Sequence, residues 1–233
     1  MKTKNKWIMG SSLALFAGQV VGTWLLNRKP QVQENTETTF NLNKDFPTIH
    51  PSSYIHPQAS VMGQVHVGER VFVGPFASIR GDEGLKIHIG SHSNVQDGVI
   101  LHGLKNFDHG GNITENTVFV EDEPFSIHIG ERVTLAHQSQ VHGPSRIESE
   151  VFVMMQALVF NSYVQEGAVL EPGCRVIGVT IPHGRYVSAG RIITKQEEAN
   201  RLPEITPEYQ YYQFNQKITD VNQELVTGYR RQQ

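Results

Sequence analysis

The sequence predicts an all-β fold, a parallel β-helix built from six-residue repeats and followed by a C-terminal α-helix. The first observation is an aliphatic residue at every sixth position over long stretches of the chain. The second is a glycine directly after several of these aliphatics, where tight corners favour a residue without a Cβ. The third is a helical pattern that replaces the repeat after Ile193. The aliphatics in phase are Ile49, Ile55, Val61, Val67, Val73 and Ile79, then Ile89, Val95 and Leu101, then Ile129, Leu135, Val141, Ile147, Val153 and Val159, then Val164, Leu170 and Val176, and last Ile181, Val187 and Ile193.

A six-residue period with one inward aliphatic per hexad is typical of a parallel β-helix. Three hexads form one triangular coil, and successive coils stack at the strand spacing of about 4.8 Å. Hexads of this form resemble those of left-handed β-helices, and the handedness is taken from that resemblance. The alternative, a β-sandwich, would alternate with a period of two and would not keep its phase over about 30 residues.

The N-terminal segment, residues 1–26, differs from the rest of the chain. It begins with Lys2, Lys4 and Lys6 and continues without charge from Trp7 to Leu26. This pattern predicts a signal peptide or an uncleaved signal anchor, with a buried core helix as the alternative. We therefore expect an extracytoplasmic protein that is secreted, periplasmic or anchored on the outer side of the membrane.

Residues 27–45 are polar and aperiodic, which predicts a linker, and the β-helix domain is expected over residues 46–193. The six-residue phase of the repeat breaks twice within this domain. Four extra residues fall near the sequence RGDEGL, between Ile79 and Ile89. The step of 28 from Leu101 to Ile129 fits either four hexads plus four residues or one hexad plus a 22-residue excursion. The stretch from Lys105 to Ser126 has poor hexad phase and several Gly, Asn and Asp residues, which favours the excursion.

Residues 194–233 are expected to form a C-terminal helical segment. Thr194 and Glu197 have the spacing of a capping box that opens a short helix. Thr206 followed by Pro207 predicts the start of a longer helix. That helix is expected to lie along one face of the β-helix through an apolar stripe of Phe214, Ile218, Val221, Leu225 and Tyr229.

Composition excludes several classes of function. The 233 residues carry a net charge of −3 with acids and bases intermixed, so we expect no nucleic-acid partner. The single cysteine, Cys174, cannot form an internal disulfide and excludes a cysteine-based zinc site.

Three histidines stand out by their position in the repeat. His102 and His142 each directly follow an inward aliphatic, so under the excursion interpretation they lie on adjacent coils, about 5 Å apart. With four intervening hexads they would be two coils and about 10 Å apart, which would make it much harder for both to bind one metal. His137 is two residues after Leu135 and points away from the pair. It could join the pair of a neighbouring chain around a threefold axis, which suggests a trimer with metals at its interfaces.

Three neutral imidazoles with one open position are the ligand set of a catalytic zinc that activates water. Taken singly, each of these histidines is better explained as a polar surface residue, and it is their shared phase that favours a metal site. The other eight histidines are assigned to the surface: His50, His56, His66, His88, His92, His109, His128 and His183.

The motifs RGDEG, SNVQDGVILH, LAHQSQVHGP, MQALVF and GVTIPHGRYV resemble those of the γ-class carbonic anhydrases. The resemblance covers about residues 46–230. It implies a left-handed β-helix homotrimer with zinc or iron(II) at each interface, where Co²⁺ can substitute in vitro. It also implies reversible hydration of CO2 to bicarbonate by a metal-bound hydroxide. Membrane contact is expected only through the N-terminal segment, if that segment is not cleaved.

The resemblance also assigns roles to individual residues of this sequence. It implies metal ligands at His102, His137 and His142. It implies that Gln96 hydrogen-bonds the metal-bound water, that Arg80 and Asp82 form an interface ion pair, and that Glu83 is an acidic loop residue near the metal. It further implies that Asn94 and Asp97 support the site, and that Asn222 belongs to the CO2 pocket.

One position departs from the family pattern. The family has a glutamate, proposed as a proton shuttle, three residues after the first metal histidine, and this chain has Lys105 there. A lysine with a pKa near ~10.4 is a poor shuttle at neutral pH, which leaves fast turnover in doubt. Asp108, His109 and Glu115 are nearby residues that could take its place.

Two other functions compete with the carbonic anhydrase. One is a non-catalytic, metal-bearing scaffold of the same family, which the lysine at the shuttle position keeps open. The other is a hexapeptide acyltransferase, since fold alone does not decide function. An acyltransferase needs one histidine as a general base, whereas this chain has three in metal phase.

Overall fold

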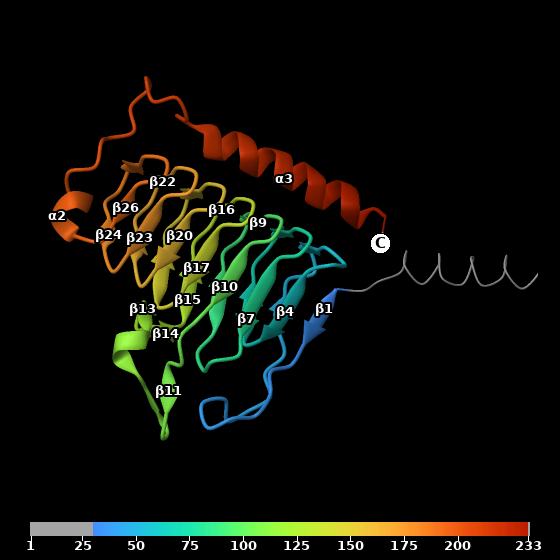
Figure 1. Cartoon of the computed structure of the whole chain (residues 1–233). Helices are drawn as coiled ribbons and strands as arrows, with labels where there is room; N and C mark the ends of the chain where they lie inside the picture. The colour runs from blue at the N-terminus through green and yellow to red at the C-terminus, as the bar shows by residue number, and fades with distance from the viewer. Residues whose placement is uncertain (1–29, 233) are drawn as a thin grey trace, which may run out of the picture.

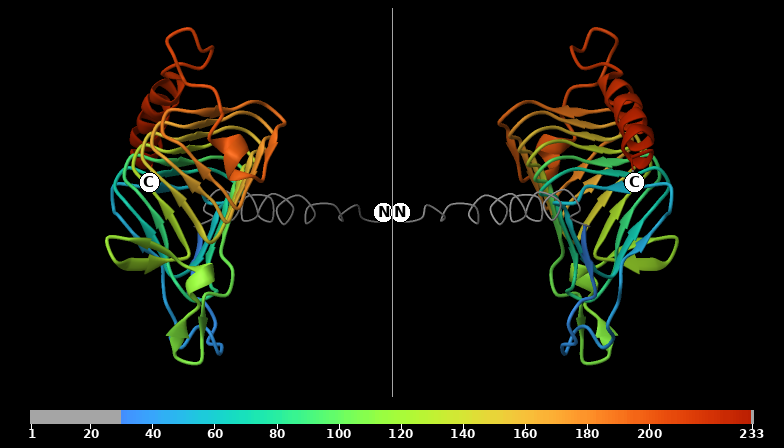
Figure 2. Two further views of the ribbon diagram at one scale, coloured as in Figure 1. Left: turned by 90° about the vertical axis from the view of Figure 1, so that its left-hand side faces the viewer. Right: turned by 90° about the vertical axis from the view of Figure 1, so that its right-hand side faces the viewer.

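The computed structural model describes residues 30–232, so the predicted signal segment lies outside the described residues. The chain forms a left-handed parallel β-helix with the helix α3 (Phe214–Arg230) along one side (Figure 1). Viewed along its length, the β-helix has a triangular cross-section with α3 outside one of its faces (Figure 2). The predicted fold class is confirmed.

Each face of the triangle is one parallel sheet, and the three are named sheet 1, sheet 2 and sheet 3. Each coil of the chain contributes a strand to sheet 3, then to sheet 1 and then to sheet 2. Sheet 1 contains, in order, β1 (Gln31–Gln33), β4 (Ser60–Gly63), β7 (Ser78–Gly81), β10 (Ile100–His102), β17 (Gln140–His142), β20 (Leu158–Phe160), β23 (Arg175–Ile177) and β26 (Ile192–Ile193). Sheet 2 contains β2 (Thr48–Ile49), β5 (Val65–Val67), β8 (Ile87–Ile89), β15 (Ile127–Ile129), β18 (Ser145–Ile147), β21 (Tyr163–Val164) and β24 (Thr180–Ile181). Sheet 3 contains β3 (Tyr54–Ile55), β6 (Phe72–Val73), β9 (Asn94–Val95), β16 (Thr134–Leu135), β19 (Phe152–Val153), β22 (Val169–Leu170) and β25 (Tyr186–Val187).

The aliphatics of the hexads form one continuous core. In sheet 1, Ile79 pairs with Leu101 and Leu101 with Val141, and all three side chains are buried. Every repeat aliphatic from Ile55 to Ile193 joins the same buried cluster. Burial of one aliphatic per hexad fixes the register, because a slip of one residue would turn the apolar side chain outward.

The corner between sheets 1 and 2 carries both interruptions of the repeat. The RGDEG loop connects β7 to β8, and a longer excursion connects β10 to β15. Because β10 pairs directly with β17, the excursion interpretation is confirmed and the four-hexad alternative is wrong. The excursion contains the hairpin strands β11 (Phe107–Asp108) and β12 (Gly111–Asn112), the 3-10 turn η1 (Thr114–Asn116), and a second hairpin of β13 (Val118–Val120) and β14 (Glu123–Phe125) (Figure 1).

The expected linker is part of the fold over most of its length. Strand β1 lies within it and pairs in parallel with β4, which extends sheet 1 by one coil. Asn35 and Asn41, also in this segment, are buried. Two of the polar residues behind the linker prediction, Asn35 and Asn41, bond through their side chains to the backbone of the folded chain, a role that composition does not reveal.

The two C-terminal helices begin later than the sequence predicts. Helix α2 (Gln196–Ala199) starts after Lys195 without a side-chain cap, so the capping box at Thr194 is wrong. Helix α3 starts after Gln213, so Thr206 and Pro207 do not open it. Tyr209 packs in stacked geometry on Tyr186 and donates its hydroxyl to Glu171, and these contacts hold residues 206–213 in turns.

Helix α3 lies along sheet 3 as expected, contacting β3, β6 and β16. Its buried residues are Asn215, Thr219, Asn222 and Val226. Within the predicted apolar stripe, Val221 is 56% exposed and Leu225 is 39% exposed. Thr219 and Asn222 form hydrogen bonds within α3, Val226 packs on the β-helix, and part of the predicted apolar stripe stays exposed.

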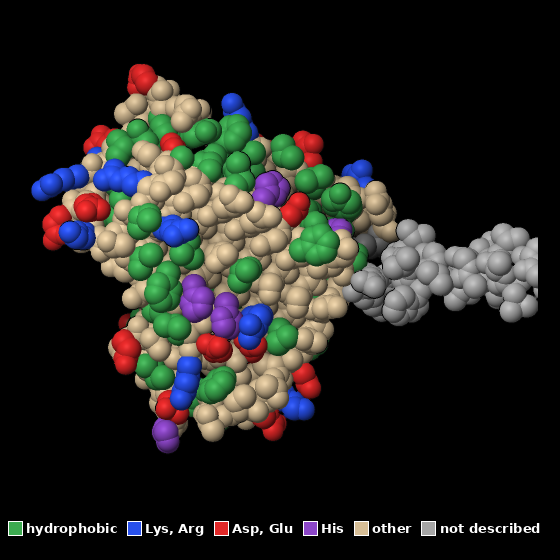
Figure 3. Space-filling view, in the orientation of Figure 1, with side chains coloured by type: hydrophobic (Ala, Val, Ile, Leu, Met, Phe, Trp, Pro, Cys, Tyr) green, Lys and Arg blue, Asp and Glu red, His purple; other side chains and the backbone are tan. Residues whose placement is uncertain are grey.

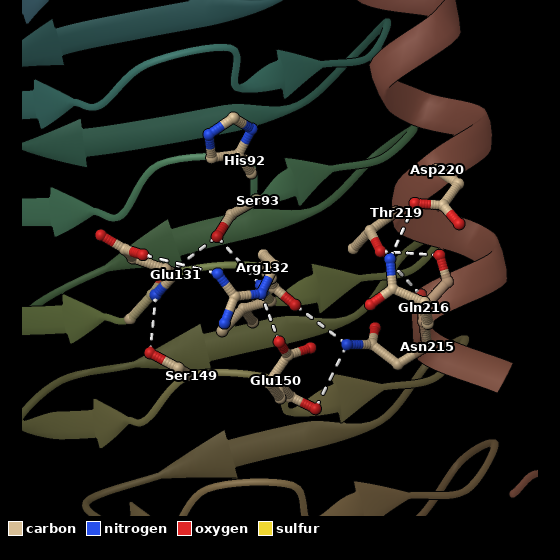
Figure 4. Close-up of polar contacts among 12 residues, drawn as sticks. His92, Ser93, Glu131, Arg132, Ser149, Glu150, Asn215, Gln216, Thr219 and Asp220 are labelled. Carbon is tan, nitrogen blue, oxygen red and sulfur yellow. Dashed lines mark hydrogen bonds and ion pairs between the residues drawn. The ribbon is translucent and has the colours of Figure 1, made fainter. Parts of the chain in front are cut away.

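The N-terminal end of α3 is held at the corner between sheets 2 and 3 (Figure 4). Asn215 Nδ2 donates to the backbone carbonyls of Arg132, at 2.9 Å, and Glu150, at 3.2 Å. The side chains of Arg132 and Glu150 form an ion pair with each other. Farther along the helix, Gln223 donates to the carbonyl oxygens of Arg70 and His92.

Candidate metal centre

His102 and His142 meet at the corner between sheets 1 and 2. They end β10 and β17 and are direct partners in the parallel register. Their ring centroids are 5.3 Å apart and the rings are nearly perpendicular, at 86°. The face that carries these strands shows two histidines side by side above acidic side chains (Figure 3). The pairing follows from the buried aliphatics just before each histidine, which lock the two coils in register.

The ring nitrogens of this pair suit a metal ligand role. His142 Nδ1 lies 3.0 Å from the carbonyl oxygen of Gly143. Since a carbonyl only accepts, Nδ1 carries the proton and Nε2 keeps its lone pair, the arrangement that typically orients a ligating histidine. His102 Nε2 is buried and has no hydrogen-bond partner. A buried, unpartnered ring nitrogen fits a ligand to a metal ion.

The RGDEG loop brings two carboxylates to His102. Asp82 Oδ1 lies 3.6 Å and Glu83 Oε1 lies 3.3 Å from His102 Nε2. The pKa of Asp82 is lowered, first by the His102 ring and then by Arg80, against the opposing effect of burial. Arg80 donates from Nη2 to Asp82 Oδ2 at 3.0 Å, so the two form an ion pair within one chain. Their role at an interface stays a prediction.

His137 lies at the other edge of sheet 1, on the corner that follows β16. It lines a cavity of about 430 Å³ between the β-helix and α3, together with Gln96 and Asn222. Its Nδ1 is 3.7 Å from Asp97 Oδ2, and both side chains are about half exposed. A carboxylate facing Nδ1 favours a proton on that nitrogen and leaves the lone pair on Nε2.

A chain of amides orients Gln96. Its Nε2 donates to Asn94 Oδ1 at 2.9 Å, and Asn94 Nδ2 donates to Thr134 Oγ1 at 3.0 Å. Because the nitrogen of Gln96 is engaged, its oxygen is the end of the amide that is open to a ligand. Asn222 Nδ2 likewise donates to the carbonyl of Ile218 in its own helix, at 2.8 Å.

The candidate ligands therefore fall into two groups on one chain. Within residues 30–232, no three His, Cys, Asp or Glu side chains gather as a metal site. His102 and His142 share one corner, and His137 occupies another. A three-histidine site would need the pair from one copy and His137 from a second copy.

The residues considered for proton transfer are also dispersed. Lys105 Nζ binds Asp108 Oδ2 at 2.9 Å, and this bond is the main cause of the lowered pKa of Asp108. His109 and Glu115 are exposed on the excursion. Of the four acidic and imidazole candidates in the described chain, Glu83 is the one in contact with a candidate ligand.

Sequence reasoning missed two contributors to these corners. His56, assigned to the surface, lines the cavity that holds Gln96 and His137. Burial lowers its pKa, and the charge of Asp97 opposes that change. The signal was present, because His56 and Gln96 hold the same hexad position, each directly after an inward aliphatic. Asn41, the second contributor, had no periodic signal.

Comparisons with known proteins identify relatives. A family model described as bacterial transferase hexapeptide (six repeats) matches residues 46–81. The chain is 48% identical over 200 residues to a carbonic anhydrase of Methanosarcina thermophila, a match that covers 85% of this chain and 81% of that protein. It is 35% identical over 181 residues to the carboxysome assembly protein CcmM of a Nostoc species, covering 78% of this chain and 31% of that longer protein. A solved hexapeptide transferase family protein from Anaplasma phagocytophilum is 21% identical, with a TM-score of 0.42, over 79% of this chain and 93% of that one.

Proposed function

The chain belongs to the γ-class carbonic anhydrases, and from this premise we propose that it hydrates CO2 reversibly to bicarbonate at metal sites shared between copies of the chain. The observation that carries the proposal is the in-register pair of His102 and His142, in which the buried Nε2 of His102 has no hydrogen-bond partner and lies 3.3 Å from the carboxylate of Glu83. The pair supplies two ligands, and His137 of a second copy would supply the third.

The donor set restricts the metal. Three neutral imidazoles suit zinc and iron(II), and we propose one of these as the native ion. When bound, such an ion supplies Lewis acidity that lowers the pKa of a water molecule to about 7. This chemistry needs an open position beside the three histidines, which the cavity next to His137 would provide.

Residues of the cavity would handle the substrate. The open oxygen of Gln96 can accept a hydrogen bond from the attacking water and so set which lone pair faces CO2. Phe72, Val221 and Leu225 line the same cavity with apolar atoms, which suit an uncharged, apolar substrate such as CO2. Asn222 adds a polar group at the wall that α3 forms.

Each turnover releases a proton, and Glu83 is placed to receive it. Its carboxylate lies beside His102 and is partly exposed, so it can reach both the site and solvent. Lys105, at the position of the family's other acidic residue, is held in an ion pair with Asp108. We propose that Glu83 carries the proton by itself in this chain.

The assembly is proposed to be a homotrimer. The outward side of sheet 1, which carries the histidine pair, also presents Ile100, 41% exposed, and Ile192, 52% exposed. Phe76 and Met155 are exposed at the adjoining corner, where His137 also lies. Packing of this apolar face against other copies would bury these side chains and bring His137 to a neighbouring histidine pair.

An extracytoplasmic location is proposed from the charge and hydropathy pattern of residues 1–26. Within the described residues, no helix has the length and apolar character to span a bilayer. A fusion of residues 1–45 to a reporter tests the proposal, because export of the reporter is expected and retention in the cytoplasm would contradict it.

A non-catalytic scaffold is the second candidate, and the lysine at position 105 favours it. One experiment separates the two functions. Protein purified anaerobically is loaded with zinc or iron(II), and CO2 hydration is followed by stopped flow. The enzyme is expected to hydrate CO2 in a metal-dependent way, with His102→Ala as the inactive control. Metal occupancy without CO2 hydration would support the scaffold function and contradict the proposed enzymatic activity.

A further inference from the structure

The RGDEG loop is held from outside by asparagines that are distant in sequence. Asn41 comes from the segment before the repeat, and Asn106 comes from the start of the excursion. Both side chains are buried, with exposed fractions of 4% and 0%. Two buried amides facing one short loop suggest that the position of the loop is fixed by more than its own ion pairs.

Asn41 brackets Glu83 by bonding to the residues on both sides of it. Its Nδ2 donates to the carbonyl oxygen of Asp82 at 2.5 Å, and its Oδ1 accepts from the backbone N–H of Gly84 at 2.9 Å. A carboxamide offers one donor and one acceptor in a plane, so it binds the two peptide groups around Glu83 much as a neighbouring strand would.

Asn106 holds the same loop from the other side. Its backbone N–H donates to the carbonyl of Glu83 at 3.1 Å, and its Oδ1 accepts from the N–H of Leu85 at 2.6 Å. Gly84 has a φ of +111°, and a Cβ there would collide with Asn106 Oδ1. Glycine at this position therefore allows the Asn106 amide to approach the loop.

The support for Asn41 is itself anchored to the β-helix. Strand β1 pairs with β4 just before this segment. Asn35 then closes the segment on itself, accepting from the N–H of Asp45 at 2.6 Å and donating to the carbonyl of Asn43 at 3.3 Å. Asn41 N–H is in turn bound by Thr38 Oγ1 at 2.9 Å. Asn41 thus reaches the loop from a fixed base.

We propose that Asn41 is a positioning residue that holds the carboxylate of Glu83 at His102, so that residues 30–45 form part of the functional site. The contact that it maintains is the 3.3 Å approach of Glu83 Oε1 to His102 Nε2. The inference rests on the proposed function only in giving Glu83 a task during turnover. The hydrogen bonds from Asn41 to the peptide groups on either side of Glu83, called the clamp below, do not depend on that function.

The clamp is tested first by measuring amide hydrogen exchange in the full chain by NMR. Asn41→Ala is expected to speed exchange of the Gly84 amide by about tenfold, as loss of one buried hydrogen bond predicts. Asn41→Asp keeps the acceptor for Gly84 and loses the donor to Asp82, so a smaller increase is expected. Asn43→Ala, at an exposed neighbour that contributes a backbone carbonyl, is the matched control. Unchanged Gly84 exchange in Asn41→Ala, with the chain still folded, would overturn the proposal.

The second test is kinetic and uses protein with a measured metal content. Asn41→Ala is expected to lower kcat in weak buffer by about tenfold or more, as misplacement of a working group predicts. Its kcat/KM should stay within about twofold, because proton removal follows CO2 hydration, and imidazole buffer should restore kcat. In the Glu83→Ala background, Asn41→Ala should have no further effect on kcat, since the two act as one unit.

Additive effects of the two substitutions, or an equal fall of kcat and kcat/KM, would show that Asn41 does not act through Glu83. If the parent chain carries metal but hydrates no CO2, the proposed function fails. Gly84 exchange then decides whether Asn41 holds the loop, so the two failures are distinguishable.

Discussion

At the scale of single residues, the site depends on which end of each polar group is already engaged. Gln96 gives its nitrogen to Asn94 and keeps its oxygen open, and His142 gives Nδ1 to a carbonyl and keeps Nε2 open. Such choices set the site's chemistry before any ligand arrives, because a group with a committed donor presents only its acceptor.

Substitution of Gln96 tests this orientation. Gln96→Ala is expected to lower kcat/KM by about tenfold to a hundredfold with metal content unchanged, because the attacking water loses its alignment. Gln96→Glu keeps an oxygen and is expected to retain more activity. The measurement is CO2 hydration alongside elemental analysis, and loss of metal in Gln96→Ala would assign the residue to metal retention instead.

Position 105 gives a prediction in the opposite direction. Lys105→Glu is expected to raise kcat in weak buffer, because a second carboxylate would stand at the family's shuttle position. The substitution also removes the pair with Asp108, and because this ion pair lies at the surface its loss should have little effect on stability. Lys105→Gln, which removes the charge without adding a carboxylate, is the control. An equal rise in both variants would point to removal of the lysine charge rather than to a new relay.

At the scale of elements, the hexad pattern predicted the coils, the two interruptions and the register of the histidine pair. These features follow from one inward aliphatic per hexad, a signal local enough to read along the chain. The prediction of a linker over residues 30–45 was wrong because Asn41 is held by hydrogen bonds to a loop about forty positions away. Such long-range bonds leave no periodic pattern in the sequence. The start of α3 was misjudged because packing of Tyr209 overrides a good local helix signal.

Sheet 2 carries a ladder of histidines that ties stability to pH. His88 and His128 stack at 4.8 Å between ring centroids, and Phe125 of the second hairpin packs edge-on against both. Burial lowers the pKa of each to about 4, with further contributions from neighbouring positive groups, while Glu123 opposes the shift. The folded ladder therefore resists protonation at pH values where the unfolded chain takes up protons.

The sign of the pH effect follows from linkage. The pKa values lie below the ordinary 6.5, so the unfolded chain binds more protons between about pH 6.5 and pH 4. The free energy of unfolding should fall as the pH is lowered through this window. We expect Tm to drop between pH 7 and pH 4.5, and His128→Gln should reduce that drop. His109→Gln, at a fully solvated site, is the control and should leave the drop unchanged.

At the scale of the whole molecule, each copy is proposed to hold two different parts of a metal site at two corners of sheet 1. Mixing of variants tests this arrangement. His102→Ala homotrimers and His137→Ala homotrimers should each lack the complete ligand set. Trimers reassembled from both chains should contain interfaces where an intact histidine pair meets an intact His137. Recovered metal binding and CO2 hydration in the mixture are expected, and no recovery despite proven subunit exchange would contradict shared sites.

The coil stacking has a consequence for how the protein fails on heating. The spacing of His102 and His142 is set by direct strand pairing between β10 and β17, so it should stay constant until the sheet unfolds. The position of the acidic loop is not set by strand pairing and depends on a few amide contacts from outside the coils. As the temperature rises, the loop contacts should therefore weaken first, and proton transfer through Glu83 should decline gradually and reversibly. Metal release and melting of the sheet should follow together, as a single later event.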